Sequence, residues 1–412
     1  MPMSSDLSIL RGLAKQYRDL AELPVQEERR QLWRAHNSLK PTRPLVLATY
    51  GMWNVWCREV FGDAQMCCAD PFLREHERTL RMQIFHHSVG DDYILEPWIT
   101  QRAAVAGEWR ALWGVKEGNH PANVEGGAWS FDPPIKDWSD LSKLIKPPHI
   151  IDEKKTAQDV ARLRDALGEI LPVNVDRTPA CSNFMADIST SIAGLRGLEQ
   201  LMLDMFDSPE QLHKLLAFMR DGILENQQAA EDAGDFSLTS GQNQCMPYAE
   251  ELESPCANSG PRQRRQIWGF FAAQEYTLIS PKMHDEFLLQ YQLPIMKQFA
   301  LTHYGCCEDL TSKIDMLRQV PNLRIIAVAP RAHLKRCAEQ IGKDYAISWR
   351  PNPADMVCAG FDEDRIRKTI RDGINICKDQ YMHLHLKDIE TVEGDPTRLA
   401  KWVKIVREES GA

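Results

Sequence analysis

The chain has 412 residues, of which 43% are hydrophobic and 26% charged, and this is ordinary for one large globular domain with extensions. Its net charge of -9 argues against a nucleic-acid partner, because phosphate binding needs a basic surface. No apolar run approaches the roughly 20 residues of a membrane helix, and the first residues lack a signal-peptide pattern. The 11 cysteines show no disulfide-framework spacing, which favours a reducing compartment. We therefore expect a soluble, cytoplasmic protein without a membrane partner.

The N-terminal part of the chain has a helical pattern. Residues 5–37 place apolar positions at helical spacing between charged ones. We expect residues 1–42 to form a helical extension that covers the outside of the fold or a subunit partner, and the second case would make the protein a homodimer. Residues 43–412 then form the main domain.

The rest of the chain alternates between short apolar segments and helical patterns. Strands are expected at 45–49, 91–96, 171–176, 236–239, near 302, and at 323–328, 345–348 and 383–386. Helices are expected at about 72–89, 153–168, 195–206, 208–232, 283–299, 310–317, 331–341, 363–378 and 396–409. Strand-helix alternation with eight strands predicts a (β/α)8 TIM barrel. A Trp- and Gly-rich insertion at 100–150 is a candidate lid.

The segment HYGCCE at residues 303–308 is the strongest chemical signal. It places an imidazole, two thiols and a carboxylate at the expected end of a barrel strand, where such barrels carry their chemistry. Thiolates and imidazole suit zinc, so His303, Cys306 and Cys307 are candidate metal ligands, and Glu308 is a candidate catalytic group. The alternative is that both cysteines are small buried hydrophobic residues.

Other candidates follow the expected strands, because loops at that face usually carry specificity. Each also has a structural interpretation, either as a core residue or as part of a surface ion pair. The substrate-binding candidates are Tyr50, Trp53, Asn174, Arg177, Asn243 and Trp349. The catalytic candidates are Arg350 and Asp388, with Lys387 beside the latter.

Three blocks of the sequence resemble a known family. They are residues 197–210, the segment ISPKMHDEF at 279–287, and SWRPNPA at 348–354. In order and character they are similar to the uroporphyrinogen decarboxylase superfamily, especially its cobalamin-dependent methyltransferase branch. The resemblance covers about residues 170–410 and implies the barrel fold.

The resemblance also implies a zinc site, with departures from the family pattern. The methyltransferases carry a His-x-Cys motif at the strand that corresponds to 301–306 and a further Cys near the last strand. If Cys306 matches the motif's Cys, its His falls on Tyr304, and no Cys follows the last strand, where Asp388 is the nearest ligand type. The implied variant site is drawn from His303, Cys306, Cys307, Glu308 and Asp388.

By this resemblance, the protein is expected to be a zinc-dependent methyltransferase. It would move a methyl group between a small O-, S- or N-methyl compound and cobalamin, a corrinoid carried by a partner protein. Tetrapyrrole decarboxylation is disfavoured, because the aromatic, uncharged segment 49–56 lacks the arginines that would bind many carboxylates. Two alternatives stay open: a metal-independent decarboxylase or lyase, and a barrel that only binds a corrinoid or tetrapyrrole.

Overall fold

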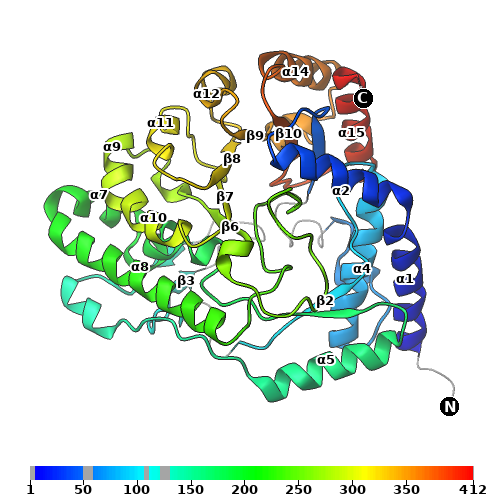
Figure 1. Ribbon diagram of the computed structural model, residues 1–412, viewed down its shortest axis with the longest axis horizontal. Coiled ribbons are helices and arrows are strands. Elements are labelled where there is room, and N and C mark those ends of the chain that lie inside the picture. The colour runs from blue at the N-terminus through cyan, green and yellow to red at the C-terminus, as the bar shows by residue number, and fades with distance from the viewer. Residues whose placement is uncertain (1–4, 50–58, 106–110, 121–129, 412) are drawn as a thin grey trace.

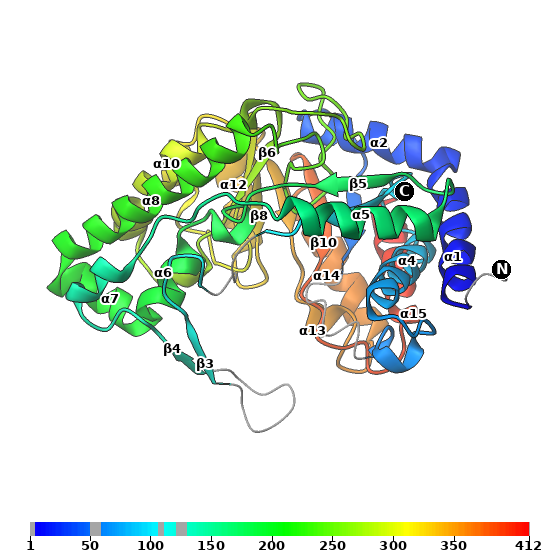
Figure 2. The same ribbon diagram turned by 90° about the horizontal axis from the view of Figure 1, so that it is seen from below.

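The computed structural model describes residues 5–49, 59–105, 111–120 and 130–411 (Figure 1). Its parallel strands are β1 (Leu45–Ala48), β2 (Ile99–Arg102), β5 (Val173–Asp176), β6 (Trp268–Phe271), β7 (Leu301–Tyr304), β8 (Leu323–Val328), β9 (Ala346–Trp349) and β10 (Met382–Leu386). They form a six-stranded sheet in the order β1-β10-β9-β8-β7-β6 and a two-stranded sheet of β2 and β5. A short antiparallel hairpin, β3 (Gly118–His120) and β4 (Ser130–Asp132), projects from the body in Figure 2.

Helices surround the strands in both views. They are α1 (Ser5–Ala21), α2 (Pro24–Asn37), α4 (Pro71–Val89), α5 (Glu153–Leu167), α6 (Ser189–Arg196), α7 (Leu198–Asp207), α8 (Pro209–Asp232), α9 (Pro281–His284), α10 (Gln290–Met296), α11 (Ile314–Leu317), α12 (Leu334–Ile341), α13 (Pro353–Met356), α14 (Glu363–Ile376) and α15 (Thr397–Ser410). The first strand pairs with the last, as it does in a closed barrel. Among the described residues, no ladder joins β1 to β2 or β5 to β6. The fold is therefore mixed α/β and consistent with a TIM barrel, without demonstrated closure.

The expectation of a strand at 91–96 is wrong, and β2 begins later, at Ile99. Here side chains take the place of a ladder. The backbone N–H groups of Val46 and Ala48 donate to the carboxylates of Asp92 and Asp91, both at 2.8 Å. Local hydrogen bonds from side chain to backbone compete with regular strand pairing in this way.

The expectation of a strand at 236–239 is also wrong. The N–H of Ser240 donates to the carbonyl of Ser237 at 3.0 Å, and the Ser240 hydroxyl accepts from the N–H of Ser237, so the segment is a turn. The fourth parallel strand in chain order is instead β6, whose four residues WGFF are all buried. The sequence analysis missed this strand.

Several expected helices are shorter or divided. The expected run 5–37 is two helices, because Pro24 starts α2 as a first-turn proline. The expected helix 195–206 is divided at Gly197, whose φ of 80° belongs to the left-handed region. The expected helix 283–299 contains a π-helical turn at Asp285–Leu289 between α9 and α10. Of the expected helix 310–317, only α11 is helical.

The two N-terminal helices have different positions. In α1, Leu10 and Ala14 belong to a hydrophobic cluster with Leu80 of α4 and Leu163 of α5, so α1 covers the outside of these helices. Helix α2 instead packs at the strands, and its Trp33 joins a cluster with residues of β1. The division of the chain at residue 42 stays a prediction.

Alternation along β9 and β10 determines which residues reach the interior of the fold. Ile347 and Trp349 of β9 pack in the main hydrophobic core, whereas Ser348 and Arg350 point the opposite way. On β10 the core residues are Leu384 and Leu386, and the residues of the inner face are His383 and His385. The inner face of these two strands is therefore polar although it is buried.

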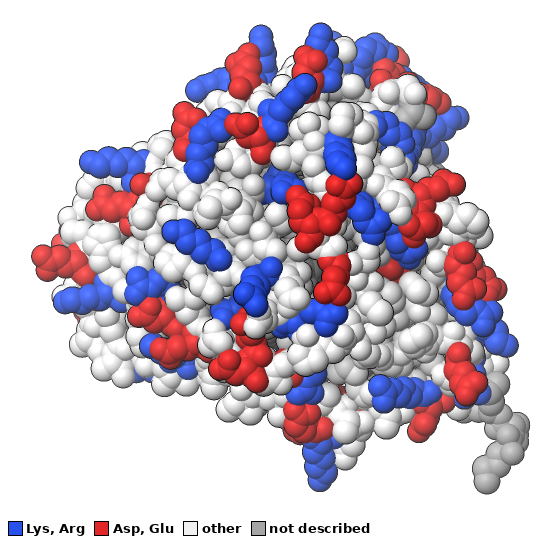
Figure 3. All heavy atoms as spheres, viewed as in Figure 1, with Lys and Arg blue, Asp and Glu red and all other residues white. Residues whose placement is uncertain are grey.

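Lysine, arginine and carboxylate side chains are interspersed over the described part of the face in Figure 3, without one large area of a single sign. This mixture agrees with the modest net charge of -9. None of the helices in the described ranges has the length and apolar character that crossing a membrane requires.

Candidate active site

The turn after β7 brings Cys306 to the carboxyl end of the sheet. Gly305 has a φ of 105°, and a Cβ there would meet Leu310 at 2.8 Å and Ala327 at 3.0 Å, so the tight turn requires glycine. The backbone N–H of Cys306 donates to the Glu308 carboxylate at 2.7 Å. The sulfur of Cys306 lies 3.5 Å from that of Cys307.

Two cations approach Cys306 from the ends of β9 and β10. The Nζ of Lys387 lies 3.0 Å from the Cys306 sulfur, and Arg350 donates to the Cys306 carbonyl at 2.6 Å. A hydrogen bond from the Cys307 thiol, followed by the charges of Arg350 and Lys387, lowers the pKa of Cys306 well below that of a free thiol, against the effect of burial. The pKa of Cys307 is raised, because its thiol donates to Cys306. The pair therefore consists of a Cys306 thiolate and a Cys307 thiol.

A loop before β6 completes the surroundings of the sulfur. Gln244 has a positive φ of 56°, uncommon for a residue with a side chain, and its amide lies 3.8 Å from the Cys306 sulfur. Its side-chain oxygen accepts from Arg350 at 2.8 Å. The neighbouring Asn243 contributes its backbone carbonyl, which accepts a hydrogen bond from His303. Its side chain bonds to the backbone of Cys245 and Met246 in its own turn.

His303 is completely buried on the inner face of β7. Burial, followed by the positive charge of Arg350, lowers its pKa well below the usual value, so the ring is neutral. Its Nδ1 donates to the Asn243 carbonyl, and its Nε2 lies 3.4 Å from a guanidinium nitrogen of Arg350. The ring therefore faces a cation and does not turn toward the sulfur atoms.

Asp388 and Glu308 both reach the cysteine pair, as the sequence analysis expected of strand-end residues. The Asp388 carboxylate lies 3.3 Å from the Cys307 sulfur and forms an ion pair with Lys387, also at 3.3 Å. Glu308 is buried and accepts from the N–H groups of Cys306 and Ala273, both at 2.7 Å. Burial raises the pKa of Glu308, and its two hydrogen bonds to backbone N–H groups hold the turn in shape.

The described residues do not assemble the expected three-ligand zinc set. No group of three or more His, Cys, Asp or Glu side chains in this part of the chain is arranged to hold a metal ion. Cys306, Cys307 and Asp388 are in contact, but His303 is turned to Arg350, and Lys387 occupies the side of the thiolate. This arrangement fits a thiolate–ammonium pair better than a zinc centre.

Three other candidates make their contacts elsewhere. The Asn174 amide donates to Thr100 and Thr239, holding β5 beside its neighbours. Arg177 pairs with Glu153 and Asp235, which is the ion-pair alternative considered for it. Trp349 lies in the outer core, against Gly373 of α14. None of the described contacts of these three residues involves Cys306, and Tyr50 and Trp53 lie outside the described residues.

The sequence analysis did not select several polar residues that surround the site. Lys387 was weighed as a pair with Asp388, for function against a surface ion pair, and Gln244 is one residue from the candidate Asn243. His383, His385 and Ser348 were not considered. The signal for the histidines was present, because the pattern MHLHL places both on one face of a strand.

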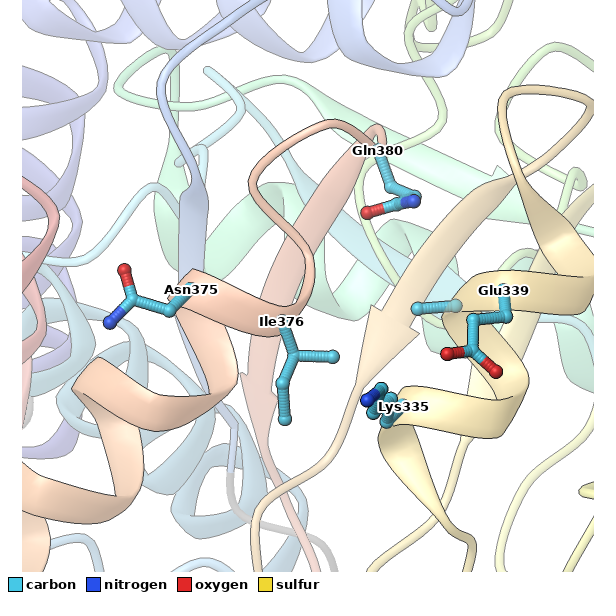
Figure 4. A pocket seen from close by; sticks show the side chains of 6 residues that line it. Lys335, Glu339, Asn375, Ile376 and Gln380 are labelled. Atoms are coloured by element: carbon cyan, nitrogen blue, oxygen red, sulfur yellow. The ribbon is translucent and has the colours of Figure 1, made fainter.

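A surface pocket of about 340 Å³ lies between α12 and α14, away from these residues (Figure 4). Lys335 and Glu339 of α12 and Asn375 and Ile376 of α14 line it. None of its described lining residues belongs to the cysteine cluster, so this pocket is not the candidate active site.

The comparisons with known proteins indicate a fold. No family model matches the chain, and no curated protein matches its sequence. A solved structure described as a methyltransferase from Methanosarcina mazei is similar to it, with a TM-score of 0.51, 11% sequence identity, and coverage of 93% of this chain and 99% of that chain. At this identity the likeness is one of fold, and it extends over nearly the whole chain.

Proposed function

We propose that this protein is a methyltransferase that moves a methyl group between a small O-, S- or N-methyl compound and a corrinoid carried by a partner protein. The observation that carries the proposal is the contact of 3.0 Å between the Lys387 ammonium and the Cys306 sulfur at the carboxyl end of β7, which favours the thiolate form of Cys306. A thiolate is a strong nucleophile at neutral pH, and carbon bound to a leaving heteroatom is its natural target. The fold shared with a methyltransferase agrees with this interpretation.

The proposed reaction has two displacements. The Cys306 sulfur attacks the methyl carbon, and the heteroatom leaves with the electron pair of the broken bond and takes up a proton. In the second displacement the methyl carbon leaves the Cys306 sulfur, which regains its thiolate pair; a bound reduced corrinoid would supply the electron pair that accepts the methyl group. Lys387 is placed to stabilise the thiolate in both steps, because its Nζ lies 3.0 Å from the sulfur.

Zinc dependence remains a prediction from the resemblance. The positive charges of Lys387 and Arg350 oppose a dication beside Cys306, and His303 does not face the sulfur atoms. The first displacement above therefore uses protein side chains alone. Metal analysis of protein purified without chelators decides the question: about one equivalent of zinc, released in Cys306→Ala, would restore the zinc-dependent form of the proposal.

A metal-independent lyase or decarboxylase is the second candidate, favoured by one observation. Arg350 is buried and bonds to a carbonyl, an amide and an imidazole, so its charge is available to a substrate carboxylate. Release of carbon dioxide from a substrate that Cys306→Ser still consumes would favour this reading over methyl transfer.

The direct test of methyl transfer is peptide mass spectrometry. Incubation with a panel of methyl donors, without any corrinoid, should add the mass of one methylene unit to the peptide that contains Cys306. The exposed Cys256 provides a matched control, because Cys256→Ser keeps every contact of the site. Persistent absence of label on Cys306 across the panel would exclude the covalent step.

A further inference from the structure

The inner face of β9 and β10 carries four polar atoms that lack a partner. The Ser348 hydroxyl, Arg350 Nε, His383 Nε2 and His385 Nδ1 are buried, and none has a hydrogen-bond partner among the described residues. The four residues expose between 0% and 3% of their surface. Buried polar atoms normally find a partner, so four together need an explanation.

The four side chains lie on the same face of the sheet. Ser348 pairs with His383 in the β9–β10 ladder, and Arg350 and His385 each follow two residues later on the same face. The rings of His383 and His385 are 6.5 Å apart between centroids. The strands therefore place the four groups as neighbours on one surface, directly below the turn of Cys306, whose carbonyl Arg350 also contacts.

All four atoms can act as donors. Arg350 Nε always carries a proton, and the Ser348 hydroxyl is free to rotate. Thr49 lies 2.6 Å from His385 Nε2, and donation from its hydroxyl leaves the proton of this neutral ring on Nδ1. His36 Nε2 lies 2.9 Å from His383 Nδ1, and donation from His36 leaves the His383 proton on Nε2. These tautomers are assigned from the hydrogen-bond network.

The surface also carries the positive charge of Arg350. The contacts of Arg350 within the described structure are the Cys306 carbonyl, the Gln244 amide oxygen and His303 Nε2, none of them a carboxylate. The Lys387 ammonium lies 3.0 Å from the Cys306 sulfur and is also paired with the Asp388 carboxylate. A substrate carboxylate would form charge-assisted hydrogen bonds with the Arg350 guanidinium and accept several hydrogen bonds at once.

We propose that Ser348, Arg350, His383 and His385 bind the carboxylate of the substrate, which makes the methyl donor a short methylated carboxylic acid. The part that names the methyl donor rests on the proposed function, whereas carboxylate binding does not. Arg350 also donates to the carbonyl of Cys306. A short acid bound to Arg350 would therefore carry its methyl group near the Cys306 sulfur.

Calorimetric titration of the whole protein with matched probes tests the site without any turnover. Two pairs differ only in charge: methoxyacetate against methoxyacetamide, and 3-(methylthio)propanoate against 3-(methylthio)propanamide. At least one acid should bind about tenfold or more tightly than its amide, because charged hydrogen bonds are lost with the carboxylate. Equal affinities within both pairs, or absence of acid binding, would overturn the proposal and leave water as the partner of these atoms.

Variants locate the binding. Ser348→Ala removes one hydroxyl from a buried position and should weaken acid binding several-fold, and Arg350→Gln should abolish the preference for acid over amide. Thr302→Val on β7, whose hydroxyl donates to the Asn322 carbonyl, is the matched control and should leave affinity unchanged. If Arg350→Gln does not fold, Ser348→Ala alone tests the carboxylate site. An unchanged affinity of Ser348→Ala for the acids would then refute the site.

The same probes separate this inference from the proposed function. Acids that bind without methylating Cys306 would refute methyl transfer while keeping the carboxylate site. Methylation of Cys306 by neutral donors with no preference for acids would keep methyl transfer and refute the carboxylate site.

Discussion

The ammonium of Lys387 lies 3.0 Å from the sulfur of Cys306, although 81 residues separate them in the chain. Lys387 follows β10 and Cys306 follows β7, so the contact depends on parallel strands that end at the same edge of the sheet. It joins a nucleophile to a group that stabilises its charged form.

Replacement of Lys387 should make the thiolate less stable. In Lys387→Met, the pKa of Cys306 should rise because one of the two adjacent cations is lost. The ultraviolet absorbance of the thiolate, followed during a pH titration and compared with Cys306→Ser, measures this change. Lys335→Met, an exposed change on α12, is the control and should titrate like the wild type. An unchanged titration in Lys387→Met would mean that the ammonium does not support the thiolate.

Removal of the Asp388 charge should affect turnover and leave folding nearly intact. Asp388 has a φ of 57°, and asparagine tolerates this region well, so Asp388→Asn keeps the backbone. The change weakens the contacts to Cys307 and Lys387 and should lower the methylation rate of Cys306. The free energy of unfolding should change by less than about 0.5 kcal/mol. Large destabilisation with a normal rate would identify Asp388 as a structural residue.

Trp349 should behave as a core residue. A Cβ at Gly373 would lie 2.1 Å from its ring, which shows how closely the indole packs on α14. Trp349→Phe should lower the free energy of unfolding by about 1–3 kcal/mol, because the smaller ring leaves a cavity. The KM for the methyl donor should stay at the wild-type value. A raised KM with unchanged stability would instead support the substrate-binding role expected from the sequence.

Buried neutral histidines should make the protein sensitive to acid. Burial lowers the pKa of His36 from 6.5 to about 4, and burial lowers the pKa values of His303, His383 and His385 well below 6.5. Below pH 6.5 the unfolded chain therefore binds protons that the folded chain does not. Stability is fully present above this pH and falls as the pH drops toward the folded values, by up to about 1.4 kcal/mol per pH unit for each histidine.

Urea unfolding at a series of pH values between about 7 and 5 measures this loss. His385→Gln should reduce the slope of stability against pH, because one such group is removed. A stability that stays constant over this range would show that the histidines are protonated in the folded protein.

The strand-end principle predicted much of the site. Cys306, Cys307, Glu308, Arg350 and Asp388 were chosen because they follow expected strands, and the structure brings them together. The position of a residue at the end of a strand did not predict on which face of the strand its side chain lies. Trp349 and Arg350 are adjacent in sequence, yet they lie on opposite faces of β9.

The two wrong strand predictions have a common physical cause. At Asp91 and Asp92, carboxylates accept the N–H groups that a strand partner would have bonded, and at Ser237 a hydroxyl-rich turn replaces extended structure. A short apolar pattern in the sequence does not reveal that side chains or a turn have replaced strand pairing. The orientation of His303 depends on the distant carbonyl of Asn243, which the local sequence does not indicate, and its role as a metal ligand stays a prediction.

The most direct measurement of the central claim is the absorbance spectrum of cob(I)alamin mixed with the protein and a panel of short methylated acids. The account predicts conversion to methylcobalamin by the wild type and by Cys256→Ser, and no conversion by Cys306→Ser. A spectrum that stays unchanged with every donor, or conversion by Cys306→Ser at the wild-type rate, would contradict methyl transfer through Cys306.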